Sequence, residues 1–271
     1  MPATPLVRWS YSSSGTNTVD ETLVIDEDGA TGLWLFAAAG RDRMDRCGTF
    51  WLPPSPALAD EARGLAMRLG AAPQTIEIVA RGGVPLALEA GGAHHQINPA
   101  SQAARTPEIE EALALAERER SRVLESPVSA IRAAMRVGAA RAGAPAAAIF
   151  EVACIGTREA LFSFEPASFA AFGYTDTGET FTWRAMGSAT MGLLDSETLD
   201  LVGGVVGQAR MAPGQRAVAT FVDALEADPG SYKVAGSVSG RMAVLDPGTT
   251  GDAFPMRPFR LATPEVSWVA R

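Results

Sequence analysis

Short segments in which apolar and polar residues alternate make up much of the chain, and glycine-containing turns separate them. Residues 7–11, Val-Arg-Trp-Ser-Tyr, have the two-residue period of a strand with one buried face. Asp26-Glu27-Asp28-Gly29 is typical of a hairpin turn in which the glycine adopts a positive φ. The pattern therefore predicts that antiparallel strands form much of the fold.

Helices are predicted where serine or threonine precedes proline, because the first residue can cap a helix and proline fits its first turn. Ser55-Pro56 begins a helix with Leu58, Leu65 and Leu69 on one face. Thr106-Pro107 begins a second helix that continues to about residue 125, and Ser126-Pro127 begins a third that ends near residue 143. A fourth helix is expected from Asp195 to Val206.

These elements predict an α+β fold of antiparallel sheets with helices packed on one face. An N-terminal α+β half would span residues 1–105, a helical junction 106–142, and a C-terminal α+β half with an extended tail 143–271. The second half resembles a repeat of the hairpin-helix-meander unit of the first, which suggests internal duplication. The alternative is that any two α+β segments can be aligned this loosely.

The composition restricts the classes of partner. The chain has 271 residues, with 23 basic and 31 acidic side chains and a net charge of −8. We expect no nucleic-acid partner, because phosphate binding requires accumulated positive charge. Arginine replaces lysine almost throughout, and together with frequent alanine, glycine and proline this suggests a GC-rich bacterial genome.

Two cysteines, Cys47 and Cys154, are the only thiols, and their spacing fits neither a zinc site nor a disulfide framework. Arg43 and Arg46 lie close to Cys47 in sequence and could lower the pKa of its thiol; the alternative is an ordinary cysteine at a strand edge. With no signal sequence and no apolar stretch of membrane-spanning length, we expect a cytoplasmic protein with reduced thiols and no membrane contact.

Any imidazole chemistry must use His94 or His95, because the chain has two histidines. They are expected on one strand, where adjacent side chains point to opposite faces, so one site can use at most one of them. Glu77 and Glu89 on neighbouring strands are candidates to orient the ring. The alternative is an exposed pair after the Gly91-Gly92 turn.

A local positive charge is the second candidate site. Arg132, Arg136 and Arg141 lie between Ser126 and Gly143 with no acidic residue between them. In the predicted helix, Arg132 and Arg136 share a face. Such a face predicts a docking site for an acidic partner or a second subunit, and the alternative is an ordinary solvated face.

The sequence contains no recognisable nucleophile motif, metal-ligand cluster or phosphate-binding loop. We therefore expect a non-enzymatic protein-binding or assembly module of a bacterial cytosolic system, an oligomer whose partner is another protein or copies of itself. Its candidate binding residues are Arg132, Arg136, His94 and His95, with no catalytic residue, cofactor or metal. The alternative is an enzyme acting on a small polar metabolite, with a site between the two halves that uses His94 or His95.

Overall fold

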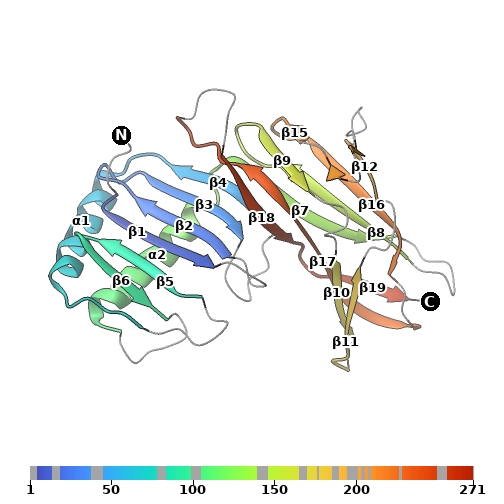
Figure 1. The fold of residues 1–271 in the computed structure, drawn as a ribbon, viewed down its shortest axis with the longest axis horizontal. Helices are drawn as coiled ribbons and strands as arrows, with labels where there is room; N and C mark the ends of the chain where they lie inside the picture. The colour runs from blue at the N-terminus through green and yellow to red at the C-terminus, as the bar shows by residue number, and fades with distance from the viewer. Residues whose placement is uncertain are drawn as a thin grey trace. The chain divides into compact units, whose positions relative to one another are not determined.

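The computed structural model describes residues 5–13, 19–37, 45–77, 84–98, 105–138, 146–164, 170–175, 177–184, 189–193, 201–202, 205–206, 209–225, 228–248 and 255–270. These residues form mostly antiparallel strands together with two helices, so the fold is α+β in the coarse sense (Figure 1). The chain divides into two compact units. The first comprises residues 1–41, 49–128 and 246–249, and the second comprises residues 42–48, 129–245 and 250–271.

The first unit is built on an antiparallel sheet with the strand order β4-β3-β2-β1-β5-β6. Each strand has five to seven residues. The strands are β1 (Val7–Ser13), β2 (Val19–Ile25), β3 (Thr31–Ala37), β4 (Arg46–Leu52), β5 (Leu86–Ala90) and β6 (Ala93–Ile97). The alternation predicted for residues 7–11 is confirmed, because Val7 and Trp9 are buried and Arg8 is exposed.

Tight turns join these strands where the sequence predicts them. Gly29 has a φ of 79°, and its N–H donates to the carbonyl of Asp26 in the turn between β2 and β3. Gly91 and Gly92 have φ values of 56° and 81° between β5 and β6. A Cβ at position 91 would lie 2.1 Å from the carbonyl oxygen of Ala66, so this turn requires glycine both for its φ and for its close approach to a helix.

The two predicted Ser/Thr-Pro helix starts are confirmed. Helix α1 (Pro56–Ala71) begins after Ser55, whose Oγ accepts from the Leu58 N–H. Helix α2 (Pro107–Val123) begins in the same way after Thr106. The two helices contact each other, α1 also contacts β5 and β6, and α2 contacts β3. The predicted apolar face of α1 is buried, with Leu65 and Leu69 fully enclosed.

The second unit contains strands only, within its described residues. Four of them form a sheet in the order β12-β16-β8-β7. Seven others form a second sheet around one long strand, β17, which pairs with β9 and β10 along one side and with β18 and β19 along the other. Strands β13 and β14 pair only with each other, in a separate two-stranded sheet. The bounds are β7 (Pro127–Val137), β8 (Ala146–Cys154), β9 (Ala160–Phe164), β10 (Ala170–Thr175), β11 (Thr180–Arg184), β12 (Ala189–Leu193), β13 (Leu201–Val202), β14 (Val205–Val206), β15 (Ala209–Met211), β16 (Arg216–Leu225), β17 (Gly230–Ala243), β18 (Met256–Ala262) and β19 (Val266–Ala270).

Three sequence predictions in this region were wrong. The helix expected from Ser126-Pro127 is strand β7, so the predicted helical junction is helical only as far as Val123. Val202 and Val206, expected on a helix, lie in the paired strands β13 and β14, and Asp195, its expected cap, lies outside the described residues. The tail expected as an extended surface segment forms β18 and β19, although Trp268 is buried as expected.

Candidate functional site

The arginines that the sequence singled out lie on an exposed strand face. On β7, Arg132, Ala134 and Arg136 are exposed, whereas Ile131, Ala133 and Met135 are buried. A two-residue period also brings residues i and i+4 to one face. Arg132 and Arg136 therefore share a face, although the element is a strand. Arg141 lies outside the described residues.

Strand pairing adds a third arginine to this face. Ala153 of β8 pairs with Arg132 of β7 on one side and with Arg216 of β16 on the other. Residues directly opposite each other in an antiparallel sheet point to the same face, so Arg216 lies on the same face as Arg132, two strands away. Its side chain is 60% exposed. No local sequence pattern indicates Arg216, because only the long-range pairing of β8 with β16 brings it to this face.

Two carboxylates on this face each contact two arginines. Glu151 on β8 lies 3.6 Å from Nη2 of Arg136 and 3.3 Å from Nη1 of Arg216. Asp45, next to β4, lies 3.2 Å from Nε of Arg132 and 3.4 Å from Nε of Arg46. Each acid thus holds two guanidinium groups side by side. The guanidinium groups keep further N–H donors, because each has five.

We call this surface the arginine face. It consists of Arg46, Arg132, Arg136 and Arg216, the acids Asp45 and Glu151, and the small apolar residues between them, Ala134, Ala153 and Val218. Its four arginines outnumber its two acids, whereas the whole chain carries a net charge of −8. The arginine face is therefore a positive region on an acidic protein, suited to contact with an anionic group.

His94 lies on an exposed face of the first unit. It pairs with Glu89 across β5 and β6, and Glu89 pairs with Arg8 on β1. The Nδ1 of His94 lies 3.6 Å from Glu89, and an Arg8 nitrogen lies 3.9 Å from the same carboxylate. All three side chains are about half exposed. This short row of charges is an ordinary surface network, and such exposed pairs contribute little stability.

His95 points to the opposite side of β6 and is fully buried, as the alternation predicts. The backbone N–H of Thr75 donates to its Nδ1 at 3.3 Å, and its Nε2 has no hydrogen-bond partner within the described residues. Glu77 does not orient this ring, because its carboxylate accepts from the N–H of Asn98. The structure therefore places the two histidines on opposite faces of β6, one exposed and one buried.

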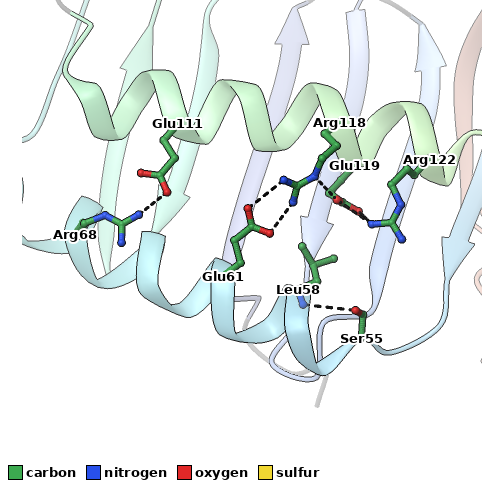
Figure 2. A network of polar contacts seen from close by, with 8 residues as sticks. All are labelled: Ser55, Leu58, Glu61, Arg68, Glu111, Arg118, Glu119 and Arg122. Carbon is green, nitrogen blue, oxygen red and sulfur yellow. Dashed lines mark hydrogen bonds and ion pairs between the residues drawn. The ribbon is translucent and has the colours of Figure 1, made fainter.

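A second ionic network joins α1 to α2 (Figure 2). The side chain of Glu119 is fully buried between Arg118 and Arg122, and Arg118 also makes two hydrogen bonds to Glu61, at 3.1 and 2.7 Å. These hydrogen bonds to Glu61 and Glu119 raise the pKa of Arg118. A buried carboxylate requires such partners, and Glu119 finds both of them on its own helix. The pairs that link the two helices, Arg118 with Glu61 and Arg68 with Glu111, are about half exposed.

The thiols are unsuited to nucleophilic chemistry. Cys47 and Cys154 are buried and are not bonded to each other. Burial raises the pKa of the Cys47 thiol well above its usual range, and burial also raises that of Cys154. The lowered pKa considered for Cys47 is therefore wrong, because its side chain is fully buried and burial disfavours the thiolate.

Two further features are not found in the described part of the chain. It holds no group of three or more histidine, cysteine, aspartate or glutamate side chains arranged to bind a metal ion. Neither of its helices has the length and apolar character needed to cross a membrane. No known protein family model matches the sequence, and no curated protein matches it.

Proposed function

We propose that this protein is a non-enzymatic binding or assembly module of a bacterial cytosolic system, and that its arginine face docks an acidic segment of a protein partner. The observation that carries this proposal is the arrangement of four arginines in pairs around Asp45 and Glu151. The guanidinium group of arginine is planar and has several N–H donors, and this geometry fits a carboxylate.

Asp45 and Glu151 order the arginine side chains for binding. A long arginine side chain loses rotamer freedom when it binds a ligand, and this loss weakens binding. Asp45 and Glu151 hold the guanidinium groups in pairs before a partner arrives. Part of the ordering cost is therefore met in the free protein.

A protein carboxylate is a better match for this face than nucleic acid. The net charge of −8 opposes the approach of a continuous phosphate backbone. A short acidic segment contacts only the arginine face. At physiological ionic strength, salt screens charges that lie more than about 8 Å away, so the acidic remainder of the surface repels such a segment weakly.

The alternative is an enzyme that uses His94 or His95 on a small polar metabolite. Its support is the pairing of His94 with Glu89, which could orient an imidazole. This alternative is weaker because the described residues hold no group of three or more side chains arranged to bind a metal ion, and because His95 is enclosed in the core.

Binding of a fluorescein-labelled oligoglutamate peptide, followed by fluorescence anisotropy, tests the proposal. A matched peptide with serine in place of glutamate measures non-electrostatic binding. We expect the double variant Arg132→Glu/Arg136→Glu to weaken oligoglutamate binding at least about tenfold, because it replaces attraction by repulsion at two positions.

Two controls accompany this test. The variant Arg8→Glu/Arg63→Glu changes the net charge equally in the first unit, where each arginine is also exposed and paired with one acid. The variant His94→Ala removes the exposed imidazole. Both should bind the peptide like the wild type. Equal binding by the wild type and the Arg132/Arg136 variant would contradict the proposed function.

Helix packing and internal duplication are two finer features of the predicted fold. We infer that α1 and α2 pack on one face of the first unit's sheet, since α1 contacts β5 and β6 and α2 contacts β3. Arg120 of α2 also bonds to Glu21 of β2. Internal duplication stays a prediction, and the helix expected to match α1 in the second half is replaced by strands wherever that segment is described.

A further inference from the structure

We propose that the partner of the arginine face is a second copy of this chain, which presents the outward stripe of α2. This inference rests on the proposed function and names its partner. The stripe consists of Glu110, Ala114, Glu117 and Ser121, which follow one another at the spacing of successive helix turns. All four residues are exposed.

The two glutamates of this stripe are available for an external partner. Other acids of α2 are engaged within the first unit, since Glu111 pairs with Arg68, and Glu119 with Arg118 and Arg122 (Figure 2). Glu110 and Glu117 take part in no ion pair within the described part of the chain. The helix thus directs its unpaired negative charge away from the unit to which it belongs.

The spacing of these charges fits the arginine face. Residues seven apart on a helix are separated by about 10.5 Å along its axis, which applies to Glu110 and Glu117. On the arginine face, one arginine pair surrounds Asp45 beside β4 and the other surrounds Glu151 on β8, with β7 between them. Two strand spacings give a separation of roughly 10 Å. Each glutamate can therefore meet one arginine pair.

The surfaces between the charges are also compatible. Ala114 lies between the two glutamates of α2 and has a short side chain. On the arginine face, Ala134 and Ala153 lie between the arginine pairs. Small residues at both centres let a helix approach the sheet closely enough for its carboxylates to reach the guanidinium groups.

Such a contact joins different surfaces of two identical chains. It is heterologous, so an open assembly keeps one free arginine face at one end and one free stripe at the other unless it closes into a ring. Attraction is local, whereas two chains of charge −8 repel each other at long range. We therefore expect association to depend on protein concentration and to weaken as salt screens the contact.

Sedimentation velocity of the full chain over a concentration series tests this inference. The variant Arg132→Glu/Arg136→Glu reverses the arginine face, and Glu110→Lys/Glu117→Lys reverses the stripe. We expect each variant to raise the apparent dissociation constant of self-association at least about tenfold. An equimolar mixture of the two should associate again, because reversed surfaces in one copy meet complementary surfaces in the other.

A control variant, Asp60→Lys/Glu89→Lys, changes the net charge as much as the stripe variant does, at exposed acids away from the stripe. It should associate like the wild type or more strongly. Circular dichroism of every variant verifies that the fold is retained. A wild-type chain that stays monomeric, or a mixture that fails to associate while both variants are folded, would overturn the inference.

Peptide binding distinguishes a failure of self-association from a failure of the proposed function. The stripe variant keeps its arginine face, so it should bind oligoglutamate at least as well as the wild type. A monomeric wild type that binds the peptide through Arg132 and Arg136 would contradict the second copy alone. Absence of peptide binding in both the wild type and the stripe variant would contradict the proposed function itself.

Discussion

At the scale of single residues, the buried thiols give the simplest test of the second unit. Cys47 lies 3.9 Å from the sulfur of Met242, and the Cys154 sulfur lies 3.5 Å from the carbonyl oxygen of Arg158. Strand β7 lies between the strands that carry them. A disulfide requires Cα atoms closer than about 7 Å, and two strand spacings exceed this.

We predict that the native protein reacts slowly with a thiol reagent at pH 8 and that the unfolded protein shows two free thiols without added reductant. The pKa of both groups is raised by burial, so at pH 8 the reactive thiolate is scarcer in the folded than in the unfolded protein. Titration with Ellman's reagent, with and without denaturant, measures this. Rapid reaction of the native protein, or no thiol after unfolding, would contradict the burial.

Some residue-level features follow from sequence alone and others do not. Alternation along a strand predicts that His94 and His95 face opposite sides, and their burial confirms it. The sharing of a face by Arg132 and Arg136 holds for either a helix or a strand. Arg216 reaches this face through strand pairing, and Asp45 contacts it through an ion pair with Arg132. Neither relation can be predicted from a local sequence pattern.

At the scale of elements, capping signals predict the helix starts but do not by themselves establish a helix. Ser55-Pro56 and Thr106-Pro107 begin helices, whereas Ser126-Pro127 begins β7. The apolar residues of β7 fit both periods over a short range. Long-range pairing decides the outcome, because β7 pairs with β8 over residues 131–137, and tertiary context overrides a weak local preference.

We predict that Leu65→Ala lowers the free energy of unfolding by about 2 to 5 kcal/mol, because Leu65 is fully buried on α1 and its loss leaves a cavity. The control is Met67→Ala on the same helix, where the side chain is 67% exposed. This change should stay within about 0.5 kcal/mol. Urea denaturation followed by circular dichroism compares them, and equal midpoints would contradict the assignment of the buried face.

At the scale of the whole molecule, composition and pattern predict an acidic α+β chain dominated by antiparallel strands, and the described fold agrees at that level. The long strand β17 was not foreseen as one element, because Gly236, Ser237, Ser239 and Gly240 interrupt its apolar pattern. Its four neighbouring strands come from both before and after it in the sequence. Only the complete chain can specify such pairing.

The central claim is that a positive face on an acidic chain binds an acidic protein segment by electrostatic attraction. The most direct measurement is the dissociation constant of wild-type protein and oligoglutamate peptide at several salt concentrations. Between about 0.05 M and 0.5 M NaCl we predict a rise of at least about tenfold, with a smaller rise for Arg132→Glu/Arg136→Glu. Affinity that does not change with salt, or changes equally in both proteins, would contradict the claim.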